Sequence, residues 1–192
     1  MSDPYVWQTL TSQKAAGTAF NTFTTAKSVI NVTELVSIQP NWMQVGRRFR
    51  VYALLGISNT STAVTFNCNV QFGTVAALAS GAIQLATTAN TNLPVVVNSE
   101  FRIDVAGSGT TAKAIGIMTI CGLAPQLGAG VANPTVSDSI VVGPSGTPAD
   151  GTGFDSTVTQ TLDFWVGFGT SAAGNQVQVW DYYVATLAGS AV

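Results

Sequence analysis

Two stretches near the middle of the chain alternate between apolar and polar side chains with a period of two. Residues 47–57 form the first stretch and residues 64–72 the second. Such alternation is typical of β-strands that bury one face and turn the other toward water. The turn-forming residues 58–61 lie between them, so we predict a β-hairpin. The apolar positions are Phe49, Val51, Ala53, Leu55 and Ile57, followed by Val64, Phe66, Cys68, Val70 and Phe72.

This hairpin cannot be stable alone. Complete burial of about eight large apolar side chains contributes roughly 12–24 kcal/mol. Ordering about two dozen backbone residues costs about 1–2 kcal/mol each, which is as large or larger. The rest of the chain must therefore supply a second apolar surface that covers the hairpin.

Further strands follow from the same pattern. Residues 75–89 are ambiguous between one helical turn at 76–79 and a short strand at 83–86. The alternation slips at Asp181-Tyr182-Tyr183, which predicts a β-bulge. The other predicted strands are residues 28–38, 94–106, 114–123, 140–142, 158–169 and 176–187.

About eight to ten strands without a convincing helix indicate an all-β fold, either a closed barrel or a two-sheet sandwich. Uneven strand spacing and one long connection favour an antiparallel jelly-roll β-sandwich over residues 28–192. The connection, residues 124–156, contains four of the seven prolines and six glycines. A loop of this length is usually functional or part of an interface.

Residues 1–27 show no sustained period, and we assign them to an extended N-terminal arm. Aromatic residues argue against plain disorder, so the arm is expected to pack along its own domain or a neighbouring subunit. Its proposed anchors are Tyr5, Trp7, Phe20 and Phe23. The first fourteen residues lack the features of a signal peptide, so we expect folding in a cytosol.

The composition is unusually poor in charge. Charged residues make up 8% of the chain, against about 25% in ordinary soluble domains. No apolar run approaches the roughly 18–20 residues that span a bilayer. Uncharged polar residues and 19 glycines supply the polarity. Such a surface suits a protein that docks many copies onto itself or a scaffold, although a secreted sandwich fits as well.

The net charge is −2, and the chain has seven Lys and Arg residues in total. This excludes the basic footprint of nucleic-acid or anionic-lipid binding. We therefore expect neither nucleic acid nor membrane as a partner. The one cluster is Arg47, Arg48 and Arg50, which is either the charged end of a strand or a phosphate or partner contact.

Histidine is absent, which excludes Ser-His-Asp and Cys-His nucleophile systems and histidine-containing metal sites. No phosphate-binding or dinucleotide-binding motif is present. The two cysteines, Cys68 and Cys121, lie in separate predicted strands. They can pair only if those strands are neighbours, and buried free thiols are the preferred interpretation.

Two further kinds of site need only carboxylates. A glycosidase requires a pair of acids, but the chain has only Glu34 and Glu100 as glutamates. Arg102, on the same face as Glu100, favours its charged form rather than a general acid. The loop from Asp150 to Asp155 resembles a calcium ligand set, with a Gly-rich turn as the alternative. We expect no enzymatic activity and no cofactor.

Five aromatic residues outside the predicted core are candidates for sugar stacking. The alternative is that they pack beneath the arm or in a subunit interface. Trp165 lies opposite the core phase of its strand. The five residues are Trp42, Trp165, Trp180, Tyr182 and Tyr183.

Several short motifs resemble small jelly-roll virion proteins of tailed bacteriophages. Residues 41–50 (NWMQVGRRFR) match the pattern N-x-L-x-V-G-D-x-x-R, except that Arg47 stands where an acidic residue is common. Residues 64–66 (VTF), 70–73 (VQFG), 92–94 (NLP) and 101–103 (FRI) resemble the middle of those proteins, and 176–187 their ending. The resemblance covers about residues 28–187, and the long segment 124–156 departs from it.

The resemblance implies a trimeric, TNF-like jelly roll with no catalytic residues, as in capsid decoration proteins, head fibres or minor tail proteins. We therefore expect a capsid decoration or cement protein located in the virion and assembled in the host cytoplasm. Its expected partners are itself, as a homotrimer, and the major capsid protein or another virion protein. The expected interface residues are Tyr5, Trp7, Phe20, Phe23, Trp42, Trp165, Trp180 and Tyr182. The alternatives are a tail-tip receptor- or carbohydrate-binding module, and a hydrolase with paired acids.

Overall fold

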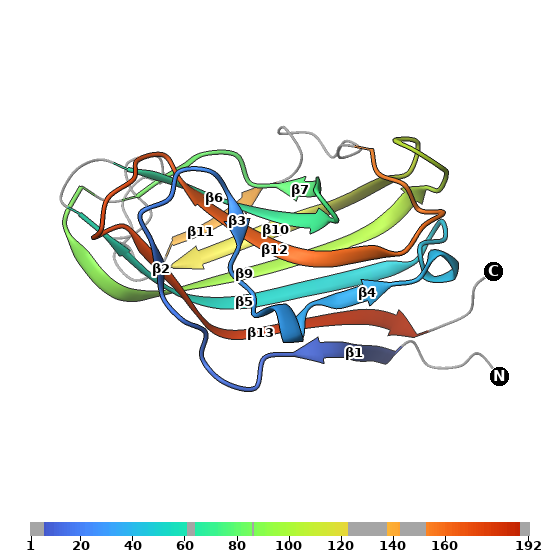
Figure 1. Cartoon of the computed structure of the whole chain (residues 1–192), viewed down its shortest axis with the longest axis horizontal. Helices are drawn as coiled ribbons and strands as arrows, with labels where there is room; N and C mark the ends of the chain where they lie inside the picture. The colour runs from blue at the N-terminus through green and yellow to red at the C-terminus, as the bar shows by residue number, and fades with distance from the viewer. Residues whose placement is uncertain (1–5, 61–63, 86, 123–137, 143–152, 189–192) are drawn as a thin grey trace.

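The computed structural model describes residues 6–60, 64–85, 87–122, 138–142 and 153–188. Its regular elements there are β-strands and two short 3-10 turns, η1 (Val32–Glu34) and η2 (Pro40–Trp42), with no α-helix in these ranges. The strands form two antiparallel sheets, A and B, packed face to face (Figure 1). The prediction of an all-β, two-sheet sandwich is confirmed, and the finer jelly-roll assignment stays a prediction.

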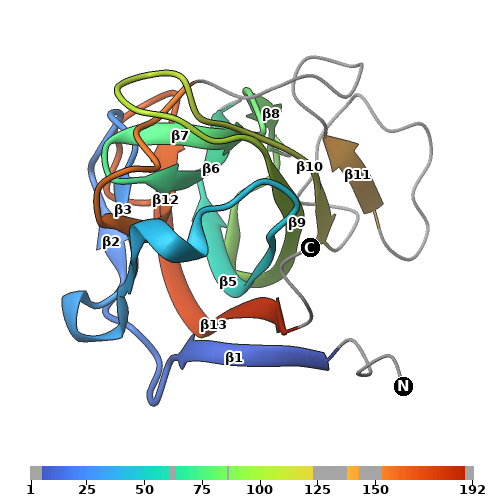
Figure 2. The ribbon, with the colours of Figure 1, turned by 90° about the vertical axis from the view of Figure 1, so that its right-hand side faces the viewer.

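Sheet A has seven strands in the spatial order β1-β13-β5-β9-β10-β11, with β2 also beside β13. Strand β1 lies at one margin of the sandwich and β11 at another (Figure 2). The strands are β1 (Val6–Ser12), β2 (Phe20–Asn21), β5 (Arg48–Asn59), β9 (Asn90–Val105), β10 (Lys113–Gly122), β11 (Asp138–Val142) and β13 (Gln176–Ala188).

Sheet B has six strands, ordered β3-β12-β6-β7, with β4 beside β12 and β8 beside β6. After β4 the chain passes from one sheet to the other: β5 belongs to A, β6–β8 to B, β9–β11 to A, β12 to B and β13 to A. The strands are β3 (Lys27–Ser28), β4 (Val36–Ile38), β6 (Thr65–Phe72), β7 (Val75–Ala79), β8 (Ile83–Gln84) and β12 (Gln160–Phe168).

The predicted hairpin between β5 and β6 is wrong. Strand β5 pairs with β13 and β9 in sheet A, whereas β6 pairs with β12 and β7 in sheet B. The chain therefore crosses from sheet A to sheet B between β5 and β6; of the predicted turn residues, Ser58 and Asn59 belong to β5 and Ser61 lies outside the described residues. A period of two tells which face of a strand is buried but not which strand lies beside it.

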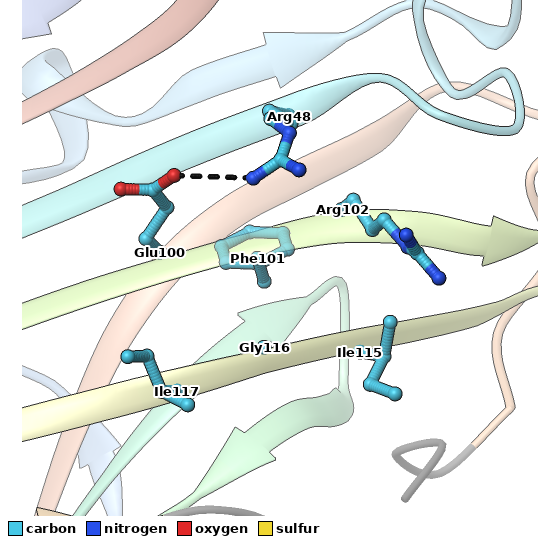
Figure 3. Close-up of a pocket in the computed structure, with 7 residues that line it drawn as sticks. All are labelled: Arg48, Glu100, Phe101, Arg102, Ile115, Gly116 and Ile117. Carbon is cyan, nitrogen blue, oxygen red and sulfur yellow. Dashed lines mark hydrogen bonds and ion pairs between the residues drawn. The ribbon is translucent and has the colours of Figure 1, made fainter. Parts of the chain in front are cut away.

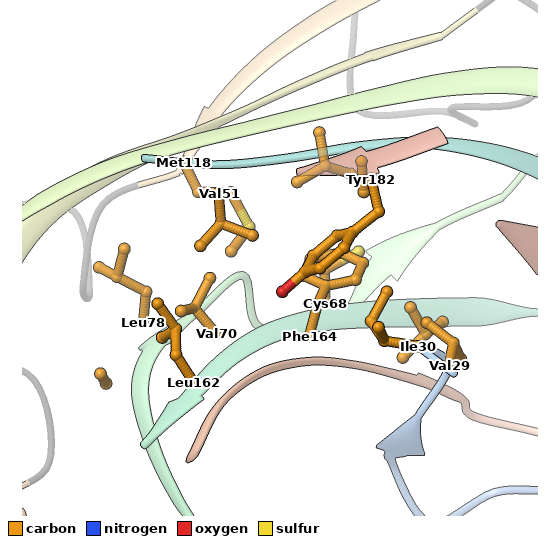
Figure 4. Close-up of a cluster of buried hydrophobic side chains, with 14 of the residues drawn as sticks. Val29, Ile30, Val51, Cys68, Val70, Leu78, Met118, Leu162, Phe164 and Tyr182 are labelled. Atoms are coloured by element: carbon orange, nitrogen blue, oxygen red, sulfur yellow. The ribbon is translucent and has the colours of Figure 1, made fainter. Parts of the chain in front are cut away.

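The apolar faces of β5 and β6 cover each other across the core instead. The rings of Phe49 and Phe72 meet edge to face with centroids 6.1 Å apart, and Phe101 from β9 stacks on Phe49 at 5.6 Å. Figure 4 shows the same arrangement further along, where Tyr182 and Val51 of sheet A point toward Phe164 and Val70 of sheet B. Each strand thus supplies the second apolar surface that the other requires.

In several other places the secondary structure differs from what the local sequence pattern predicts. Residues 75–89 contain β7 and β8 rather than a helical turn, and the predicted strand 28–38 is divided into β3, η1 and β4. Asn31 interrupts that strand, because its side chain accepts a hydrogen bond from the Thr33 amide and caps η1. These short pieces raise the strand number above the predicted eight to ten.

The N-terminal segment packs along its own sandwich in this chain. Strands β1 and β2 pair with β13, and β3 pairs with β12. Phe23 is buried and meets Phe168 edge to face at 5.5 Å. Residues 6–28 therefore contribute to both sheets and to the core. Most of the predicted connection 124–156 lies outside the described residues, apart from β11 and residues 153–156.

Candidate interaction face

The two outer faces of the sandwich differ in chemistry. Outside sheet B, the outward residues of β6 are uncharged and polar, namely Thr65, Asn67, Asn69 and Gln71. Outside sheet A, the outward residues are largely aliphatic, aromatic and arginine. An antiparallel sheet with one solvated face normally carries polar residues there, so the outer face of sheet A requires a different explanation.

We define face A as a set of outward side chains from the central part and the arginine-rich end of β13, β5, β9 and β10. The strand registers place them in rows that run across the sheet. Its members are Asp181, Tyr183, Arg48, Arg50, Tyr52, Leu54, Val96, Asn98, Glu100, Arg102, Ile115, Ile117 and Thr119.

Two stacked tyrosines occupy the middle of face A. Tyr52 and Tyr183 lie opposite each other on β5 and β13, with ring centroids 5.1 Å apart and an interplanar angle of 15°. Partial burial raises the pKa of Tyr52, and the negative charge of Asp181 adds to this effect. Asp181 therefore lies near the tyrosine pair on the same face.

One end of face A is rich in arginine. Arg48 and Arg50 both contact the carboxylate of Glu100, at 3.4 and 3.0 Å, and Arg102 contacts Asp104 at 2.7 Å. Three guanidinium groups and two carboxylates give this cluster a net charge of +1, whereas the whole chain carries −2. The arginine cluster noted in the sequence thus belongs to a larger surface that includes β9.

A shallow groove opens at this end, between β9 and β10 (Figure 3). Gly116 lies in this groove and lets β9 and β10 pair closely, since a Cβ there would lie 2.3 Å from the carbonyl oxygen of Glu100 and 2.4 Å from the Cβ of Phe101. Ile117 at the margin is 48% exposed. The lining residues are Arg48, Glu100, Phe101, Arg102, Ile115, Gly116 and Ile117.

The predicted interface residue Trp7 extends face A onto β1. The guanidinium carbon of Arg50 lies 4.3 Å from the centroid of the Trp7 ring, a cation–π geometry. Arg50 is thereby held between the Trp7 ring and the Glu100 carboxylate. Trp7 is half-buried in this arrangement.

Trp180 lies at the opposite end of sheet A, where the predicted bulge is confirmed. The β13–β5 register shifts between Val179 and Asp181. The Trp180 indole covers Gly56, because a Cβ on Gly56 would lie only 2.4 Å from a ring carbon. Its Nε1–H donates to Oε1 of Gln178 at 3.2 Å.

The prediction that Tyr182 belongs to an exposed aromatic group is wrong. The bulge adds one residue, so Tyr182 falls in phase with the core and is completely buried. Its hydroxyl has no hydrogen-bond partner in the described part of the chain. Burial raises the pKa of Tyr182 strongly, with a further contribution from the charge of Asp163. Phe23 is also a core residue rather than a surface anchor.

The other predicted interface residues lie away from face A. Trp42 is half-buried, with the Arg47 guanidinium 5.6 Å from its ring. Trp165, half-buried on the outer side of sheet B, donates its Nε1–H to Asp163 at 2.6 Å. Phe20 is half-buried with the Lys27 ammonium 5.1 Å from its ring. Tyr5 lies outside the described residues.

Sequence reasoning missed most of face A, although one signal was present. On the outward side of β5, the residues after Arg50 are Tyr52, Leu54 and Gly56, which is not the polar series of a solvated strand. The regular apolar series on the inward side of β5 indicated a strand with one solvated face, so the outward residues were expected to be polar.

Asp163 is the most buried carboxylate among the described acidic residues. Burial raises its pKa, while hydrogen bonds from Trp165, from the Ser28 hydroxyl and from the Phe164 amide oppose the rise. These donors satisfy the carboxylate and tie β3 to β12. The arrangement is that of a structural side chain, because all its contacts are within the fold.

The remaining sequence candidates are the aspartates of the predicted calcium loop and the two cysteines. Asp155 accepts hydrogen bonds from the amides of Gly109 and Thr157 and from the Thr157 hydroxyl, which lower its pKa. Asp150 lies outside the described residues. Cys68 faces the core from sheet B, whereas Cys121 belongs to sheet A, and they form no disulfide with each other. No cluster of three His, Cys, Asp or Glu residues that could hold a metal occurs in the described ranges.

Comparisons with known proteins add little to this picture. No family model and no curated protein matches the chain. One similar solved structure is described as the CBM2 module of the evolved Dit of Lactobacillus casei BL23 phage J-1. It is 11% identical, with coverage of 100% of this chain and 82% of that one, at a TM-score of 0.30. Because the TM-score is low, this likeness assigns neither a family nor a role to the chain. Among the described residues, no helix has the length and apolarity needed to cross a membrane.

Proposed function

We propose that this protein is a non-enzymatic structural protein of a bacteriophage virion, a capsid decoration protein that binds the shell as a homotrimer. The motifs at residues 41–50 and 64–73 support the phage context by resemblance, and the two-sheet antiparallel sandwich is the architecture that the resemblance implies. Its partners in this proposal are further copies of itself and the major capsid protein.

The composition of face A supports a contact between protein chains of the assembly. Tyrosine, tryptophan and arginine are the residues enriched at the centres of protein interfaces, whereas lysine and glutamate are depleted there. Face A contains the stacked Tyr52 and Tyr183, the Trp7–Arg50 pair and the half-exposed Ile117. Exposure of this apolar and aromatic area to water is unfavourable, and binding to a protein partner buries it.

A trimer binds the shell more tightly than a single chain does, because it makes the same contact three times. Each copy presents the same weak contact, and the second and third contacts form at a high effective concentration once the first has formed. A decoration protein therefore needs no deep pocket and no strong single contact.

Co-sedimentation with phage shells assembled without the protein tests the proposal. The wild-type chain should pellet with the shells up to a fixed copy number. Ile117→Lys on face A should lower the bound fraction, whereas Asn69→Lys, a matched change on the outer face of sheet B, should not. If the wild-type chain stays in the supernatant at all concentrations, the decoration role is wrong.

A tail-tip carbohydrate-binding module is the second candidate, and one observation favours it. Trp165 lies opposite Asn69 on the outer face of sheet B, with Asn67 and Gln71 further along the same strand. An aromatic ring beside amides is a combination that binds sugars. Host glycans should then shift the tryptophan fluorescence of the wild-type chain but not of Trp165→Phe. An unchanged wild-type spectrum would remove this candidate.

A further inference from the structure

The charges of face A are separated along its strands. Asp181 lies opposite Leu54 on β5, while Arg50 and Arg48 come four and six residues before Leu54 on the same strand. Residues two apart in a strand are about 6.7 Å apart, so the acidic and basic ends are separated by about 13–20 Å. Asp181 is exposed and forms no ion pair with any described residue.

We propose that face A packs against a second copy of this chain, with Asp181 of one copy paired to Arg48 or Arg50 of the next. This inference rests on the proposed function in one respect, because it assigns the self-contact of the proposed homotrimer. The partner is a second copy because the face itself carries the charge that complements its arginine end.

The surface between the two charged ends suits burial. Tyr52 and Tyr183 form its centre, with Leu54 and Val96 on one side and Ile117 on the other. Apolar area at the centre of an interface supplies the affinity, and charges at its margin select the partner and its orientation.

The separation of the charges also fixes the kind of assembly. A contact between the acidic end of one copy and the basic end of the next is heterologous, and repeated heterologous contacts close into a ring when the rotation permits. A ring of three satisfies every Asp181 and every arginine cluster. In a single chain, Asp181 has no ionic partner among the residues that the structure describes.

Sedimentation equilibrium of the full chain with charge exchange tests this pairing. Asp181→Arg and Arg48→Glu should each weaken self-association about tenfold. The double variant Asp181→Arg/Arg48→Glu should return to within a few-fold of wild type, since the pair is restored in reverse. Thr74→Glu/Ala79→Glu, at exposed positions of the β6–β7 edge, lowers the net charge as much as Arg48→Glu and should leave self-association unchanged. Thermal unfolding by circular dichroism confirms that each variant is folded.

Three results would overturn the inference: a wild-type chain that stays monomeric, single variants that associate as wild type does, or a double variant that is not rescued. Co-sedimentation with phage shells shows whether the self-contact or the proposed decoration role is the part that is wrong. A chain that associates through Asp181 but ignores shells retains the inference alone. A chain that binds shells as a monomer retains the decoration role alone.

Discussion

Single residues in this protein show how a local irregularity changes the environment of a side chain. Trp180 is the extra residue of the β13 bulge, and its presence moves Tyr182 from the outer face to the core. The phenol then lies among apolar side chains, where its hydroxyl finds no partner within the described residues (Figure 4). A buried hydroxyl without a hydrogen bond lowers stability.

Tyr182→Phe should therefore increase the free energy of unfolding by about 1 kcal/mol, because the unsatisfied hydroxyl is removed and the ring is retained. Urea denaturation measures the change. Tyr52→Phe, whose hydroxyl is on the outer face, serves as the control and should change the stability by less than about 0.5 kcal/mol. A loss of stability in Tyr182→Phe would mean that the hydroxyl is bonded.

Asp163 provides a pH-dependent prediction. Its pKa in the folded chain is raised above the ordinary value of 3.8 by burial, so the unfolded chain loses this proton at lower pH than the folded chain. Between the two values the folded state binds more protons, and its stability falls as the pH rises. The free energy of unfolding of the wild type, minus that of Asp163→Asn, should decrease as the pH rises through and above 3.8, the ordinary pKa of an aspartate. A difference that increases over this range contradicts the raised pKa.

At the scale of whole elements, alternation located the long strands but not their neighbours. Strands β5, β6, β9, β10, β12 and β13 all fall where period two places them. The sheet to which a strand belongs depends on contacts distant in sequence, and this is why β5 and β6 were paired wrongly. Short strands such as β2 and β3 exist only because β13 and β12 offer free edges, which no local pattern encodes.

Face A was predictable only in part, because the strands that lie side by side in it are distant in sequence. Trp7 and the arginine cluster could be named from residue type alone. Their union with Ile117 and Glu100 requires the register between β5, β9 and β10. One inserted residue reverses the phase of everything that follows it, so the predicted bulge already implied that Tyr182 points inward, although Tyr182 was assigned to the exposed aromatic residues.

Deletion of Trp180 tests the role of the bulge. The remaining residues then alternate without interruption, with Val179 and Tyr182 inward and Asp181 outward, so the core is preserved. We expect a folded chain that is less stable by no more than about 1–2 kcal/mol, as measured by urea denaturation.

Deletion of Gln178 is the matched control. It shortens β13 equally but directs Trp180 into the core in place of Val179, and it should be far more destabilising. Equal losses of stability from the two deletions would contradict the assigned register.

At the scale of the molecule, the described part of the N-terminal segment packs along its own sandwich, which is one of the two arrangements expected for the arm. Strand β1 contributes Trp7 to face A, while residues 20–30 contribute Phe23, Val29 and Ile30 to the core. A truncation that ends before residue 20 therefore removes Trp7 from face A and leaves the core intact. A truncation that extends past Phe23 also removes a core residue.

Removal of residues 1–12 should leave a cooperatively folded chain, because β1 lies at the edge of sheet A. Removal of residues 1–27 should cost about 3–5 kcal/mol more, since the buried Phe23 ring is lost with it. Thermal unfolding followed by circular dichroism compares the two. Equal stability of both truncations would show that Phe23 does not contribute to the core.

The central claim is that face A is a surface between chains, and the native mass of the wild-type protein tests it most directly. Light scattering on a sizing column should give one species of three 19.8 kDa chains, about 60 kDa. A mass near 19.8 kDa that does not change with increasing concentration would contradict the account.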